Sequence, residues 1–159
     1  MTSPPTPVTV TLAQICDAIE TTLSTATGLG VHQSYDELTE NIADHATLQV
    51  YPESGNTDAW TSNDRTTHQR GVAVTEFIFH ADLYAQQRIN IGEDMAALSP
   101  LIDAIIARLE AQKTGALFGL TVSGVDVIKA FKWSWSRVVF EYAAVKYMGA
   151  RFVITIRVF

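Results

Sequence analysis

The chain has 159 residues, of which 47% are hydrophobic and 18% charged, and its formal net charge is -6. This composition indicates one packed domain with its own core, because a disordered chain has fewer apolar residues and more charge. No apolar run approaches membrane-spanning length, and the first residues lack the basic and apolar segments of a signal peptide, so we expect a soluble, intracellular protein. The single cysteine, Cys16, excludes an internal disulfide and is expected in the core.

The charges are unevenly distributed. Residues 1–64 contain nine acidic residues and no Lys or Arg, whereas residues 65–159 contain all eleven basic residues and eight acidic ones. An acidic chain without a basic cluster is a poor candidate for tight DNA or RNA binding, because that affinity comes chiefly from neutralising phosphates. The acidic half is interpreted either as a solvated surface or as a contact with a basic neighbour.

The chain begins with a segment that predicts an arm followed by a helix. Residues 1–8 are proline-rich and predict an extended arm that is mobile or docks on a partner. Thr11 and Gln14 form the pattern of a capping box, and apolar residues at helical spacing follow, so residues 11–25 predict a helix. Residues 31–45 are mostly polar and are interpreted as a loop or a short helical turn.

Two strands are predicted on either side of a long loop. Residues 46–51 predict a strand that ends at Pro52. Residues 53–70 predict a polar loop, of a length that usually either contacts a partner or stays disordered until it does. Residues 71–84 alternate over their whole length and predict the longest strand of the first half. One of its faces carries the side chains of Val72, Val74, Glu76, Ile78, His80, Asp82 and Tyr84.

A second amphipathic helix is predicted next. The pair Ser99-Pro100 is a favoured helix start, and an apolar stripe runs from there toward Lys113. Strands are predicted over residues 117–122 and 125–135, the second with Phe131, Trp133 and Trp135 on one side.

The chain ends in a predicted strand. Residues 140–146 are ambiguous between helix and loop, residues 148–150 are interpreted as a turn, and residues 151–159 predict the strand. Alternation places Arg151 and Arg157 on its polar face. If this face and the polar face of the strand at 71–84 lie on the same side, the two arginines form ion pairs with Glu76 and Asp82, either between strands of one chain or between subunits.

The fold class predicted from these elements is α+β. We expect a mainly antiparallel sheet of about four to five strands, with two amphipathic helices packed on one face. Residues 1–159 form a single domain, in which we identify no internal repeat and no linker.

Catalytic and ligand-binding motifs are weak in this sequence. His80 and Asp82 lie two apart on a predicted strand and so share a face, which is compatible with an oriented imidazole or the start of a metal site, but no third ligand has a recognisable spacing. The turn at Gly28 and Gly30 follows a helix rather than a strand and is better explained as a helix end than as a phosphate loop. We therefore expect no enzyme activity, no catalytic residue, no metal and no cofactor.

The order of elements resembles the tail terminator family of long-tailed bacteriophages, proteins similar to the lambda tail terminator. The matching features are the first helix, the Val50-Tyr51-Pro52 phrase, the polar loop that opens into a long strand, a helix of the Leu-Ile-Asp-Ala-Ile type, a strand with Trp133 and Trp135, and the ending at 147–158. The resemblance covers nearly the whole chain, through strand and helix patterns rather than invariant residues.

This resemblance implies a structural virion protein that forms a ring, commonly of six subunits, on the last ring of the tail tube. Such a ring terminates tube polymerisation and joins the tail to a head connector or stopper protein, after assembly in the host cytoplasm. DNA would pass through the lumen without specific binding, as the acidic charge also favours, and no membrane is involved. Candidates for the contacts with neighbours are Glu53, Asp58, Trp60, Asp64, Arg65, Arg70, Glu76, Asp82, Arg151 and Arg157.

Two alternatives remain open from the sequence. The chain is also compatible with another neck, connector or tube subunit, of which a tube subunit would polymerise into long filaments. A less favoured alternative is a small ligand-binding or hydrolytic α+β domain that uses a pocket between the second helix and the sheet.

Overall fold

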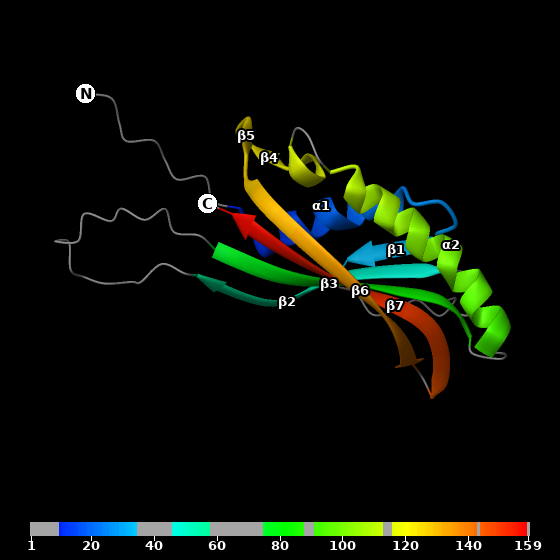
Figure 1. Cartoon of the computed structure of the whole chain (residues 1–159). Coiled ribbons are helices and arrows are strands. Elements are labelled where there is room, and N and C mark those ends of the chain that lie inside the picture. The colour runs from blue at the N-terminus through cyan, green and yellow to red at the C-terminus, as the bar shows by residue number, and fades with distance from the viewer. Residues whose placement is uncertain are drawn as a thin grey trace, which may run out of the picture.

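A computed structural model describes residues 10–34, 46–57, 75–87, 91–112, 116–142 and 144–158. These residues form a five-stranded sheet in the order β1-β2-β3-β7-β6, together with a small separate hairpin of β4 and β5. Figure 1 shows this arrangement, with α1 lying against the strands. The elements are α1 (Leu12–Ser24), β1 (Val31–Ser34), β2 (Thr47–Thr57), β3 (Thr75–Gln87), α2 (Ile91–Glu110), the 3-10 turn η1 (Leu117–Gly119), β4 (Thr121–Val122), β5 (Val125–Asp126), β6 (Ile128–Tyr142) and β7 (Val145–Val158).

The sheet is mainly antiparallel. Strand β1 pairs with β2 in parallel, whereas the pairs β2–β3, β3–β7 and β6–β7 are antiparallel. Both helices pack into one core with a single face of this sheet. The predicted α+β class, with two helices on one face of a mainly antiparallel sheet, is confirmed.

The first helix forms as its sequence predicts. Thr11 accepts a hydrogen bond from the Gln14 backbone and the Gln14 side chain accepts one from the Thr11 backbone, so the capping box is complete. The helix buries one stripe against the sheet, and Cys16 lies in that stripe, where its thiol donates to the Val50 carbonyl oxygen at 3.3 Å. The predicted core position of Cys16 is confirmed. The buried stripe consists of Ile15, Cys16, Ile19 and Leu23.

The second helix begins earlier than predicted. It starts at Ile91 and contains Pro100 inside it, so the prediction of a start at Ser99-Pro100 was wrong. Leu98 is fully buried, and Ile102 is buried four residues later. The apolar stripe therefore continues through the proline, and its burial offsets the backbone hydrogen bond that proline cannot donate. At the other end, Arg108 donates to the Thr25 carbonyl oxygen at 3.1 Å and joins the ends of the two helices.

Two predictions in the first half were also wrong. Of the segment 31–45, predicted as a loop or helical turn, residues 31–34 instead form β1, because they pair in parallel with β2, a contact that their own sequence does not show; residues 35–45 lie outside the described residues. The next strand does not stop at Pro52 but runs on to Thr57, and a register shift between Pro52 and Ser54 accommodates the residue that lacks an N–H group. Of the predicted loop at 53–70, residues 53–57 are therefore strand, and residues 58–70 lie outside the described residues.

The hairpin of β6 and β7 is longer than predicted. Strand β6 runs through Tyr142 and β7 begins at Val145, so residues 140–142 and 145–146 of the ambiguous segment are strand. The interpretation of residues 148–150 as a turn was wrong, because β7 passes straight through them. Gly149 is needed there for space rather than for turning, since a Cβ atom at this position would lie 2.1 Å from the Leu83 carbonyl oxygen.

The remaining differences concern the start of β3 and the segment at 117–122. Strand β3 runs from Thr75 to Gln87, and residues 71–74 of the predicted strand lie outside the described residues. The predicted strand at 117–122 is instead η1 followed by the first strand of the β4–β5 hairpin, because Phe118 has a φ of 55°, which interrupts an extended strand. No helix in the described part of the chain is long and apolar enough to cross a membrane.

Candidate functional site

The sheet has a second face, opposite α1 and α2, which we call the open face. In the pairing of β3 with β7, Asp82 lies beside Arg151 and Glu76 beside Arg157. Core residues such as Phe79 and Ile154 point to the helices, so their neighbours in sequence point to the open face. The predicted polar faces of the two strands therefore coincide.

An ion pair, Asp82 with Arg151, lies near the middle of the open face, and its carboxylate accepts three hydrogen bonds. Arg151 donates to Asp82 through Nε at 2.8 Å and through Nη2 at 3.0 Å, and the Tyr51 hydroxyl donates to the same carboxylate at 2.7 Å. Asp82 is only 2% exposed. A buried carboxylate requires such partners, because water no longer solvates it. We call Tyr51, Asp82 and Arg151 the Asp82 cluster.

The Asp82 cluster fixes the protonation of its members. Burial, and then the hydrogen bond to the Asp82 carboxylate, raise the pKa of Tyr51 well above its ordinary value. The hydrogen bonds to Asp82 raise the pKa of Arg151, against the opposing effect of burial. The phenol stays neutral and the guanidinium stays charged, so the arrangement suits a fixed cross-strand link better than proton transfer.

His80 lies beside this cluster. Its Nδ1 atom is 3.3 Å from the Tyr51 hydroxyl oxygen and 3.7 Å from Glu53 Oε2. Its ring packs edge-on against Tyr51, with the centroids 5.5 Å apart. The structure thus gives His80 a tyrosine and a glutamate as neighbours, in addition to the shared face with Asp82. No group of three or more His, Cys, Asp or Glu side chains that could hold a metal occurs among the described residues.

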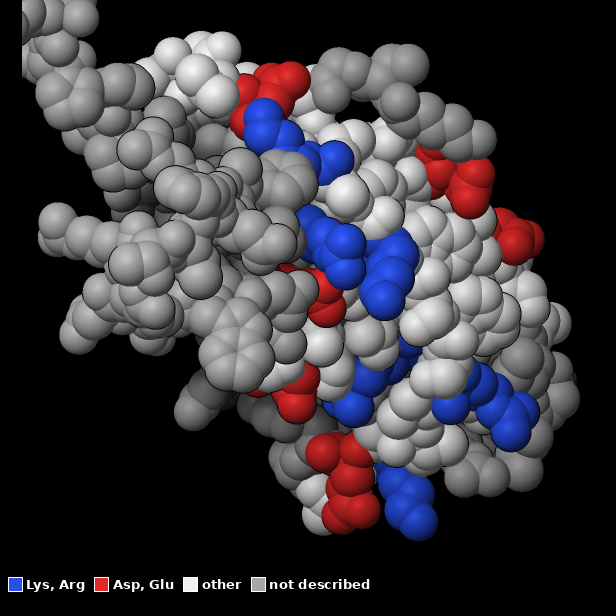
Figure 2. Space-filling view, turned by 60° about the vertical axis from the view of Figure 1, so that its left-hand side comes forward, with Lys and Arg blue, Asp and Glu red and all other residues white. Residues whose placement is uncertain are grey.

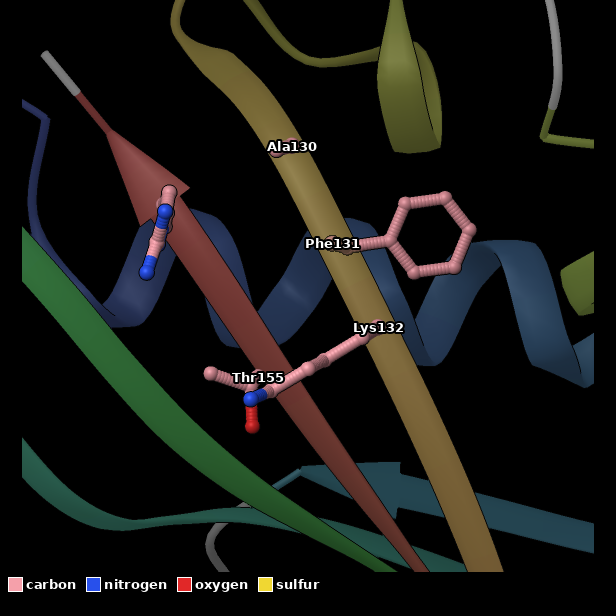
Figure 3. Close-up of a pocket in the computed structure, with 5 residues that line it drawn as sticks. Ala130, Phe131, Lys132 and Thr155 are labelled. Atoms are coloured by element: carbon pink, nitrogen blue, oxygen red, sulfur yellow. The ribbon is translucent and has the colours of Figure 1, made fainter.

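A small pocket lies on the open face between β6 and β7. It has a volume of about 210 Å³, and Lys132, Thr155 and Arg157 supply its polar groups. Figure 3 shows Lys132 extending from β6 across β7 toward Thr155, while Phe131 points away. Arg157 also donates to Glu76 through Nε at 3.0 Å. We call this the Lys132 pocket; Ala130 and Phe131 complete its lining.

An aromatic cluster occupies the open face beyond the Asp82 cluster. Tyr84 and Phe140 have ring centroids 4.4 Å apart, and Tyr147 packs edge-on against Tyr84. All three are buried, separately from the main core. The Arg151 guanidinium carbon lies 5.6 Å from the centre of the Phe140 ring, so the aromatic cluster and the Asp82 cluster are in contact.

Strand β6 forms one edge of the sheet and carries exposed apolar side chains. Trp135 is 44% exposed and Val139 is 41% exposed, and no strand of the described chain pairs with the outer edge of β6. A shallow cavity of about 400 Å³ lies where Leu109 and Glu110 of α2 approach Phe131 and Trp133 of β6.

Basic residues concentrate on the same hairpin. Figure 2 shows a band of Lys and Arg side chains with Asp and Glu side chains beside it. Six of the eleven basic residues of the chain belong to β6 and β7: Lys129, Lys132, Arg137, Lys146, Arg151 and Arg157.

The structure brings four of the ten predicted contact residues together as two ion pairs within one chain, Asp82 with Arg151 and Glu76 with Arg157. The predicted cross-strand pairing is thereby confirmed. Glu53 is exposed near His80, whereas the remaining five lie outside the described residues: Asp58, Trp60, Asp64, Arg65 and Arg70.

Sequence reasoning missed Tyr51, Lys132 and Thr155. Alternation alone placed Thr155 on the polar face of its strand, but the register that puts Lys132 beside Thr155 and Tyr51 beside His80 depends on pairing across the sheet.

Comparison with known proteins adds no relative, since no protein-family model and no curated protein matches the sequence.

Proposed function

We propose that this chain is a structural subunit that assembles into a ring at the head-proximal end of a phage tail tube. The ring ends tube growth and joins the tail to a head connector. The proposal starts from the resemblance to the tail terminator family in element order and residues. In a ring, each subunit contacts its two neighbours through two different surfaces, so the chain must offer both.

The observation that carries the proposal is the β6 edge. A strand of 15 residues lies at the edge of the sheet, with Trp135 and Val139 exposed beside it. A long edge strand with exposed apolar side chains is normally covered by another chain, because it otherwise promotes aggregation. The opposite edge of the sheet is β1, so the two edges differ in length and sequence. Contact between unlike edges repeats from subunit to subunit and produces a ring when the rotation closes.

A ligand-binding domain is the second candidate, and the shallow cavity between α2 and β6 favours it. Its lining mixes apolar Leu109 and Trp133 with polar Glu110 and Gln112. A ligand-binding domain should bind its ligand while the protein is a monomer, whereas a tail terminator must assemble into an oligomer.

Native mass spectrometry combined with negative-stain microscopy of the full chain tests the proposal. We expect one discrete oligomer, a ring of six, that does not lengthen as the protein concentration rises. Long filaments would identify a tube subunit instead. Monomers at every concentration, also in the presence of tube protein, would refute ring formation.

A further inference from the structure

The Lys132 pocket contains hydrogen-bond donors that the described part of the chain leaves without acceptors. Thr155 is 8% exposed, lines the pocket, and its hydroxyl has no hydrogen-bond partner among the described residues. Lys132 has no acidic partner there either, and Arg157 uses only its Nε atom to bind Glu76. A buried polar group without a partner is costly, so such a group facing a cavity indicates that something else satisfies it.

The chemistry of these groups selects an anion. An ammonium, a guanidinium and a hydroxyl all donate hydrogen bonds, and two of the three carry positive charge. Glu76 binds Arg157 and compensates one of these two charges. Glu110 lines the shallow cavity between α2 and β6 together with Lys132, but in the described part of the chain it forms no ion pair with Lys132. Since a water molecule occupies roughly 30 Å³, a cavity of about 210 Å³ has room for an acidic side chain.

The charge distribution of the chain identifies the source of that anion. Residues 1–64 carry nine acidic residues and no basic ones, and they include α1, β1 and β2. The basic hairpin of β6 and β7 forms the opposite side of the sheet. Of the nine acids, Asp17 and Glu20 lie on α1 and Glu53 lies on β2, β1 carries none, and the other six lie outside the described residues. A head-to-tail contact that brings residues 1–64 of one copy to the β6–β7 hairpin of the next therefore joins surfaces of opposite charge, the complementarity that a heterologous contact requires.

We infer that the Lys132 pocket receives an acidic side chain from residues 1–64 of a second copy of this chain. This inference rests on the proposed function, because the pocket is filled only if copies of the chain assemble. It adds to that function the two surfaces that meet. The net charge of -6 argues against nucleic acid as the occupant.

The first test compares the assembly of three full-length variants by sedimentation velocity. Lys132→Glu should raise the dissociation constant of the oligomer about 10- to 100-fold, the cost of losing hydrogen bonds to a charged group. Thr155→Val keeps the shape of the side chain, loses only the hydroxyl, and should raise the constant by about 2- to 10-fold. Lys146→Glu is the matched control, because Lys146 is exposed on β7 outside the pocket, and about 2-fold or less is expected.

The second test locates the acid directly. Carbodiimide cross-linking of an oligomer mixed from light- and heavy-nitrogen chains should join Lys132 to an Asp or Glu within residues 1–64 of a different chain. Failure to find this cross-link, or cross-linking to an acid in residues 65–159, would overturn the inference.

The outcomes separate the inference from the proposed function. A wild-type ring in which Lys132→Glu behaves like Lys146→Glu refutes the inference alone. A variant that assembles normally but loses binding of inorganic phosphate or of a DNA oligonucleotide shows a different occupant and also refutes it. A wild-type chain that forms only dimers, weakened by Lys132→Glu, supports the inference and refutes the ring.

Discussion

Asp82→Asn tests how much the Asp82 cluster contributes to stability. The substitution keeps the size of the side chain and removes its charge. Asp82 accepts three hydrogen bonds and is 2% exposed, whereas the side chain of its partner Arg151 is 33% exposed. Breaking a fully buried pair costs about 3 to 5 kcal/mol. Because water solvates part of the remaining guanidinium, we expect the free energy of unfolding to fall by about 2 to 3 kcal/mol.

Glu76→Gln is the matched control for this change. It lies on the same strand and also pairs with an arginine of β7, but the side chain of Arg157 is 53% exposed. We expect a loss of about 0.2 to 1 kcal/mol. Urea unfolding followed by tryptophan fluorescence, at one protein concentration, measures both. With a slope of about 2 kcal/mol per molar urea, the midpoint should shift by roughly 1 M for Asp82→Asn and by less than about 0.5 M for the control. Equal shifts would refute the reasoning from burial.

Three further predictions concern the core, the phenol and the histidine. Ile154→Ala removes a fully buried side chain and should cost about 2 to 5 kcal/mol in the same urea assay. The raised pKa of Tyr51 favours the neutral phenol in the folded state, so its stabilisation is complete below the unfolded value of about 10 and is lost as the pH rises above it. Wild-type stability relative to Tyr51→Phe should therefore decline above about pH 10 in urea titrations at increasing pH, and a constant difference would contradict this assignment. His80→Ala loses a 3.3 Å contact with the Tyr51 hydroxyl, the edge-on packing against the Tyr51 ring and a 3.7 Å contact with Glu53, and it should leave ring assembly intact. Folded rings of normal shape that fail in tail joining would instead indicate a chemical role.

Local patterns predicted the elements whose signals lie within a few residues. The capping box joins Thr11 to Gln14, three residues later, and it forms as predicted. The alternation in β3 and β7 identified the polar faces correctly. The pairs Asp82–Arg151 and Glu76–Arg157 then followed from one further condition, namely that the two polar faces lie on the same side of the sheet.

The wrong predictions concern residues whose role depends on distant neighbours. Pro100 looks like a helix start, but the core contact of Leu98 extends the helix before it. Gly149 looks like a turn residue, but it provides space for the Leu83 carbonyl of a neighbouring strand. The Lys132 pocket needs the register of β6 against β7, which no pattern within either strand supplies.

Electron microscopy of tail tubes grown with this chain present shows whether the chain terminates them. We expect a single ring on one end of each tube and no growth from that end, while addition of the chain to finished tubes leaves their length unchanged. Two results would contradict the assignment as a tail terminator. In the first, the chain is incorporated along the whole tube. In the second, tubes carry no ring and grow at the same rate even at a saturating concentration of the chain.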